Sequence, residues 1–131
     1  MMRALTLCFA VVFGGVGPVF AGSYDDQYCT VISDADRHNS KGARLTTVAQ
    51  VIQNERANFH NNRHRDDGDE TDFTFQSKSA RAQMAGMFRA NSVGPFLSEQ
   101  IVSGYGNVSV CVWASGVDFP ALVIEVWRLG R

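Results

Sequence analysis

Residues Thr47 to Asp72 read TVAQVIQNERANFHNNRHRDDGDETD, and the rest of the chain is organised around this stretch. Its first half has helical periodicity, because Val48, Val51, Ile52 and Phe59 fall on one face. Thr47 and Gln50 have the spacing of a capping box, which satisfies two unpaired backbone donors at a helix start. Asn61 and Asn62 tolerate left-handed conformations, so we expect the helix to end at this pair.

Glu55 interrupts the apolar face of this predicted helix. Counting from Val48 at about 3.6 residues per turn places Glu55 on the stripe that ends at Phe59. A buried unpaired charge is costly, so Glu55 needs a partner or a raised pKa unless the helix turns it toward solvent. The structural interpretation is a salt bridge to Arg44, Arg56 or Arg81. The functional interpretation is a carboxylate lining a cleft, which makes Glu55 the best acid–base candidate in the chain.

A small secreted hydrolase or nuclease is therefore the alternative function. Such enzymes often combine helices and a terminal antiparallel sheet with His, Glu and Arg chemistry, and Glu55 and His60 would be the catalytic pair. This is an argument from fold-level analogy, which does not establish function. No serine lies in a Gly-x-Ser-x-Gly elbow, and no Gly-rich phosphate loop precedes a helix.

The charged second half of the stretch raises the question of a metal site. His60 and His64 have the i, i+4 spacing of helical zinc sites, but the expected helix end separates them. The carboxylates between Asp66 and Asp72 do not match the spacing of a calcium-binding EF-hand loop. We therefore expect an exposed, mobile acidic loop and no metal or other cofactor; the weak candidate ligands are His60, His64, Asp66, Asp69 and Asp72.

The chain begins with the pattern of a signal peptide. A basic Arg3, an apolar run from Ala4 to Val16 and the compact residues before Gly22 predict a signal peptide over residues 1–21. Residues 22–131 would form a single exported domain, periplasmic or secreted, with no membrane span after cleavage. Removing Arg3 from 12 Lys plus Arg leaves 11, against 13 Asp plus Glu. The resulting net charge of −2 gives no reason to expect a nucleic-acid partner.

Two cysteines, Cys29 and Cys111, remain after this cleavage, whereas Cys8 lies in the predicted signal peptide. An even pair in a small exported domain predicts a disulfide. A disulfide would make the first strand and the penultimate strand neighbours in one sheet.

The other expected helices and strands follow from hydrophobic periodicity and from residues that interrupt regular structure. We expect a first strand over 28–32, a polar loop over 34–44, helices over 79–90 and 95–102, and strands over 107–114 and 121–129. Phe73 and Phe75 are expected to pack the acidic loop onto the core. This order predicts an α+β fold in which the first strand and a C-terminal hairpin form a small antiparallel sheet, covered on one face by two to three helices.

Aromatic residues are the candidates for a binding surface. Tyr105, Trp113 and Trp127 are candidate binding residues, because aromatic side chains dominate interface hot spots. Trp113 shares a predicted strand face with Cys111, so it could instead pack beside the disulfide. We therefore expect a small exported domain that binds an unknown protein or envelope ligand, with an inhibitor-like module as one form of such a binder.

Overall fold

The computed structural model describes residues 24–89, 92–117, 119 and 122–130, so the predicted signal peptide lies outside the described part. It contains strands β1 (Tyr24–Ile32), β2 (Val108–Gly116) and β3 (Val123–Arg128), helices α1 (Val48–His60), α2 (Lys78–Ala82) and α3 (Pro95–Ser103), and short 3-10 helices η1 (Ala35–Arg37) and η2 (Met84–Met87). Among the described residues, no helix is both long and apolar enough to cross a membrane.

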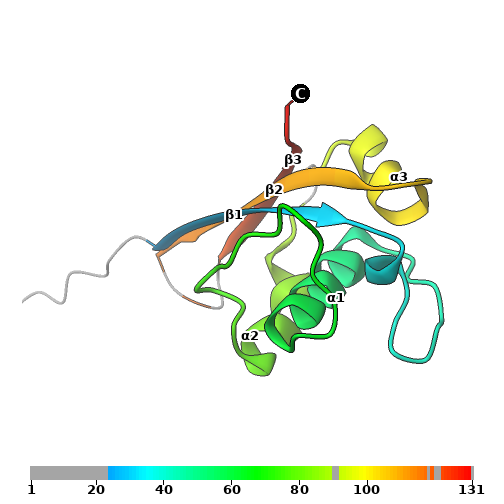
Figure 1. Cartoon of the computed structure of the whole chain (residues 1–131). Coiled ribbons are helices and arrows are strands. Elements are labelled where there is room, and N and C mark those ends of the chain that lie inside the picture. Colours follow the sequence, from blue (N-terminus) through cyan, green and yellow to red (C-terminus); the bar gives the residue numbers. More distant parts are fainter. Residues whose placement is uncertain (1–23, 90–91, 118, 120–121, 131) are drawn as a thin grey trace, which may run out of the picture.

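The three strands form one antiparallel sheet in the order β1-β2-β3 (Figure 1), which confirms the predicted α+β fold. The predicted disulfide is also confirmed, because Cys29 on β1 is bonded to Cys111 on β2. These two residues are direct partners in the strand register. The bond therefore joins the edge strand β1 to the central strand at one level of the sheet.

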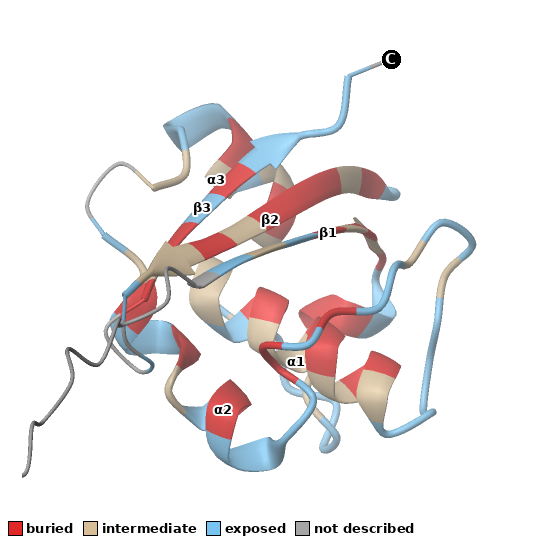
Figure 2. Cartoon of the chain, turned by 90° about the vertical axis from the view of Figure 1, so that its left-hand side faces the viewer, coloured by how far each residue is buried: buried red, intermediate tan, exposed pale blue. Residues whose placement is uncertain are grey.

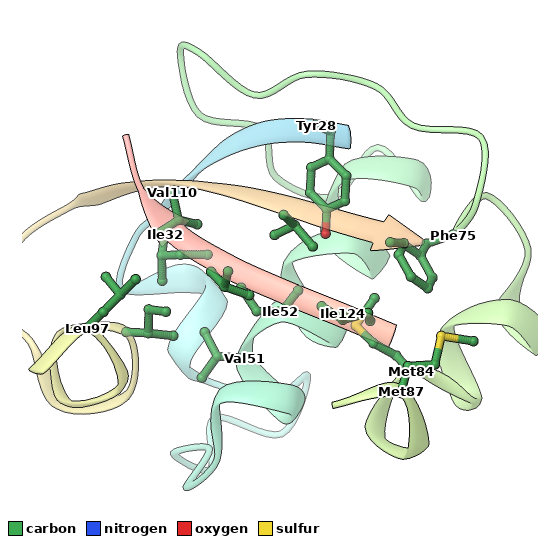
Figure 3. Close-up of a cluster of buried hydrophobic side chains, with 14 of the residues drawn as sticks. Tyr28, Ile32, Val51, Ile52, Phe75, Met84, Met87, Leu97, Val110 and Ile124 are labelled. Carbon is green, nitrogen blue, oxygen red and sulfur yellow. The ribbon is translucent and has the colours of Figure 1, made fainter. Parts of the chain in front are cut away.

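The sheet buries one face against the helices. On β2, Val108, Val110, Val112 and Ala114 are buried, and the residues that alternate with them point to the other side. Helices α1 and α2 lie on a single side of the sheet (Figure 1), and Figure 2 shows buried residues along β2 and on α1. The core between these layers contains apolar side chains from the sheet, from all three α-helices and from η2, including those labelled in Figure 3.

Local signals set both ends of α1 as predicted. The Thr47 hydroxyl accepts a hydrogen bond from the Gln50 backbone N–H at 3.2 Å, and the Gln50 side chain accepts one from the Thr47 N–H at 3.2 Å. The helix ends at His60, and Asn62 has a left-handed φ of 54°. Val51, Ile52 and Phe59 are buried, so the predicted apolar face is the one that meets the core.

The helix expected over residues 79–90 is shorter and broken. It is α2, which begins at Lys78 and ends at Ala82, and η2 follows it. Gly86 lies within η2, and glycine disfavours a continuing α-helix. A 3-10 helix aligns residues i and i+3, so Met84 and Met87 still reach the core together.

Two further expectations need correction. The segment 34–44 is not simply a polar loop, because it contains η1 and the buried side chains of Asp36 and Arg37. Phe75 packs in the core as expected, but Phe73 is 81% exposed. One phenylalanine is enough to hold this segment on the core, so the other remains in solvent.

Candidate functional site

A buried network of charged side chains occupies the end of α1. The Arg56 guanidinium donates to both carboxylate oxygens of Glu55, with an Nε–Oε2 distance of 2.6 Å. It also donates through Nη1 to Asp72 Oδ1 at 3.0 Å. All three side chains are at most 1% exposed. Of the three candidate partners for Glu55, the structure therefore selects Arg56.

His60 joins the same network through Asp72. Its Nε2 lies 2.6 Å from Asp72 Oδ1, and the other Asp72 oxygen accepts a hydrogen bond from the Phe75 backbone N–H at 2.5 Å. Glu55 and His60 are thus connected only through Arg56 and Asp72. The proposed catalytic pair does not meet directly.

Arg56 also makes cation–π contacts with two neighbouring aromatic rings. Its guanidinium carbon lies 4.0 Å from the centroid of the Tyr28 ring and 4.5 Å from that of Phe59. Desolvated cation–π contacts of this kind contribute about 2 kcal/mol. Burial raises the pKa of the Tyr28 hydroxyl, and Arg56 opposes that rise. The network is therefore enclosed by aromatic side chains.

Burial raises the pKa of Glu55 to about 7, against the lowering effect of its bonds to Arg56 and Thr30. The Thr30 hydroxyl lies 2.8 Å from Glu55 Oε1 and 2.8 Å from Asp69 Oδ1. One hydroxyl has one proton, so it can donate to only one of these carboxylates at a time. If Glu55 were protonated, it could donate its own proton to the Thr30 oxygen. The Thr30 hydroxyl proton would then be available to Asp69.

The acidic segment Asp66–Asp72 is not an exposed loop as a whole, which corrects the prediction. Asp72 is buried, and Asp69 accepts a hydrogen bond from the Val31 backbone N–H at 2.9 Å. Glu70 is paired with Cys29 through two bonds, one from each backbone N–H, at 2.7 and 2.9 Å. Strand β1 is an edge strand, and this segment accepts hydrogen bonds from the Cys29 and Val31 N–H groups on its free edge.

The side chains considered as weak metal ligands contact different partners. His64 lies 3.1 Å from Asp66 and 3.3 Å from Ser33, whereas His60 faces Asp72. Within the described ranges, no group of three or more His, Cys, Asp and Glu side chains is arranged to hold a metal ion. Because α1 ends at His60, His64 lies outside the helix and contacts different partners from His60.

A second candidate site lies on the side of the sheet opposite α1 and α2, and we name it the outer sheet face. It carries Gln27, Cys29, Cys111, Trp113, Glu125 and Trp127. Cys111 pairs with Trp127 across the strands, and Trp113 pairs with Glu125, so the two tryptophans are diagonal neighbours. Trp127 is 38% exposed and Trp113 is half-buried.

The disulfide and a hydrogen bond hold these aromatic side chains in place. Cys111 is buried on the central strand β2, directly opposite Trp127 in the register. The indole N–H of Trp113 donates to the Asp25 carboxylate on β1. Both the interface role and the packing role considered for Trp113 are compatible with this position. Tyr105 is fully exposed in the loop between α3 and β2 and is not one of the residues of the outer sheet face.

Sequence reasoning missed the buried polar groups of η1. Asp36 accepts hydrogen bonds from the Ser33 backbone and hydroxyl and from the Asn58 amide, and burial raises its pKa. Arg37 donates to backbone carbonyls of Ile101 and Gly106, 64 and 69 residues away. Partners at that separation leave no local pattern, so no signal could have identified those of Arg37, whereas the Ser33–Asp36 bond spans only three residues and has a local spacing.

Comparison of the chain with protein-family models, with curated proteins and with solved structures finds no match.

Proposed function

We propose that this chain is a small exported domain that binds a protein or envelope ligand through the outer sheet face. The observation that carries this proposal is the diagonal pair Trp113 and Trp127 on the solvent side of the sheet. Tryptophan is enriched among the few residues that supply most of the binding energy of an interface. An inhibitor-like module is one form of such a binder.

The surroundings of the tryptophans support a protein-binding surface. Gln27 and Glu125 are exposed beside them, so polar groups surround an apolar centre. This arrangement resembles interfaces in which a polar rim encloses a hydrophobic core. The Cys29–Cys111 bond and the Trp113–Asp25 hydrogen bond restrain the surface before binding, which reduces the entropy lost when a partner docks.

Export to the periplasm or to the exterior is part of the same proposal. It is supported by the predicted signal peptide over residues 1–21 and by the disulfide, which persists in oxidising compartments.

Capture of a partner tests the proposal. The mature domain, immobilised and incubated with an envelope or culture extract of the source cells, is expected to retain a specific protein or envelope component. Trp127→Ala should reduce this retention by about tenfold or more, the loss typical of an interface hot spot.

Phe73→Ala provides the matched control, because Phe73 is an exposed aromatic residue in the segment between α1 and α2. This variant should retain the partner like the unmodified domain, and thermal unfolding should show that both variants are folded. Equal capture by the Trp127 variant and the unmodified domain would contradict the proposal.

The hydrolase alternative is favoured by one observation, the pKa of about 7 at Glu55, which suits general acid–base chemistry at neutral pH. Against it, the Glu55 side chain is 1% exposed and both of its oxygens bond to Arg56. Hydrolysis assays with RNA and with peptide substrates would distinguish the two functions. Turnover that is lost in Glu55→Gln, with folding retained, would favour the enzyme.

A further inference from the structure

A polar pocket lies where the C-terminal end of α3 meets the start of β2. Its volume is about 270 Å³, and Arg37, Gln100, Tyr105, Asn107 and Arg128 line it. Among the described residues of the lining, none is Asp or Glu. Two guanidinium groups therefore contribute positive charge to a pocket whose lining carries no negative side chain.

Arg37 forms the buried part of this pocket. The residue is 1% exposed, and its guanidinium donates to the carbonyls of Ile101 at 2.9 Å, Gly106 at 2.9 Å and Gln100 at 3.1 Å. These acceptors are neutral and use three of the five N–H donors of the side chain. In the part of the chain that the structure describes, no carboxylate oxygen lies within 4.0 Å of this guanidinium.

The direct partners of the Arg37 guanidinium are thus carbonyl dipoles, while the Asp34 and Asp36 carboxylates attract it from farther away. The carbonyls of Gln100 and Ile101 belong to the last turn of α3, where the helix dipole favours a cation. A buried charge ordinarily has a charged partner, because removing a charge from water is costly. An anion in the pocket would add a charged partner in direct contact with the guanidinium, closer than Asp34 and Asp36.

Arg128 and Tyr105 form the accessible side of the pocket. Arg128 is exposed, and its Nη1 donates to Gln100 Oε1 at 3.2 Å. This single bond to a neutral amide leaves most of its donors available for a ligand. Tyr105 is fully exposed, so its ring offers a surface on which the remainder of a ligand could pack.

We propose that this pocket binds an oxyanion, namely the phosphate or carboxylate group of a small ligand. Arginine matches the geometry of both groups through paired N–H donors, and the resulting charge-assisted bonds are about twice as strong as neutral ones. Arg128 holds the anion from the solvent side, Arg37 supplies the buried positive charge, and Asn107 and Tyr105 are further polar residues of the lining.

Titration of the folded mature domain with inorganic phosphate, and separately with acetate, tests the site by amide chemical shifts. Saturable shifts of Gly104, Gly106 and Asn107 are expected for at least one anion. A response to phosphate identifies the phosphate class, and a response to acetate alone identifies the carboxylate class. Arg128→Gln should weaken the binding by about tenfold.

Arg63→Gln is the matched control, because Arg63 is an exposed arginine that lines a different groove, of about 310 Å³, together with Lys78 and Arg81. It removes the same charge and should leave the affinity unchanged. The proposal is overturned if neither anion saturates these shifts, if Arg128→Gln binds as tightly as the unmodified domain, or if Arg63→Gln weakens binding equally. These probes do not involve the outer sheet face, so the result is independent of the proposed protein partner.

Discussion

Arg56 is the residue on which the charged interior depends. It is fully buried, pairs with Glu55 and Asp72, and packs against the rings of Tyr28 and Phe59. Removing one member of a buried ion pair costs about 3–5 kcal/mol, because the remaining charge is left in a medium of low polarity. The network therefore restricts substitutions at these positions whether or not it has a chemical role.

At this scale we predict that Glu55 makes stability depend on pH. Its pKa rises from 4.5 to about 7 on folding, so the folded state holds this proton at pH values where the unfolded state has lost it. The free energy of unfolding should fall as the pH rises from about 4.5 to about 7 and then level off. Urea unfolding measured across this range, for the unmodified domain and for Glu55→Gln, checks the prediction.

Because glutamine cannot ionise, the variant should lack this contribution, although Asp36 still adds a fall in the same direction. Glu99→Gln is the control, since Glu99 is exposed on α3. If the unmodified domain and the Glu55 variant show the same pH dependence, Glu55 is ionised throughout the range.

At the scale of elements, the acidic segment protects the free edge of β1. An exposed edge strand offers unpaired N–H and C=O groups to other chains and promotes aggregation. Here the N–H groups of Cys29 and Val31 donate to the side chains of Glu70 and Asp69, and Asp26 accepts from the backbone of Phe73 at 3.0 Å. The acidic side chains thus satisfy two backbone donors of this edge and also place negative charge beside it.

Asp69→Ala is expected to destabilise the domain by about 1–3 kcal/mol, the cost of leaving buried or partly buried donors without acceptors. Asp69 accepts from the backbone N–H groups of Val31 at 2.9 Å and Asp66 at 2.7 Å. Hydrogen exchange should become faster at the Val31 amide, and denaturant unfolding should give the stability change. Asp67→Ala, at an exposed neighbouring position, should have little effect on either measurement. Unaltered exchange at Val31 in the Asp69 variant would mean that water replaces the carboxylate at no cost.

At the scale of the whole molecule, the disulfide ties the two ends of the domain together. It joins residues separated by 82 positions, and all three α-helices lie between them in the sequence. Both cysteines are on the outer sheet face, so the bond also restrains the surface that we propose for binding. Stability and binding geometry are thus linked through one covalent bond.

Replacing both Cys29 and Cys111 with Ser should lower the free energy of unfolding by about 4 kcal/mol, the chain-entropy value for a loop of this length. Chemical denaturation under non-reducing conditions checks this.

Intact-mass analysis of the exported protein should find these two cysteines oxidised and Cys8 removed with residues 1–21. Two free thiols, or an uncleaved N-terminus, would contradict the export hypothesis.

The sequence by itself determined the elements that depend on local interactions. The capping box at Thr47, the end of α1 at the asparagine pair and the alternation of β2 each act over a few residues, so a pattern could predict them. The disulfide followed from counting cysteines, and the burial of Glu55 followed from helical periodicity. The position of Trp113 on the Cys111 face followed from strand alternation.

Only the tertiary structure decided which distant groups meet. Asp72 joins His60 to Arg56, and the acidic segment pairs with β1. Arg37 donates to a carbonyl beyond the end of α3. The partners in these contacts are 12 to 69 residues apart in the sequence. Trp127 reaches Trp113 only because β3 pairs with β2 in one register. Polar side chains have no periodic signal of their own, and their burial depends on finding acceptors or charges elsewhere in the chain. Such partners are chosen when the whole chain folds, so they cannot be read from any one segment.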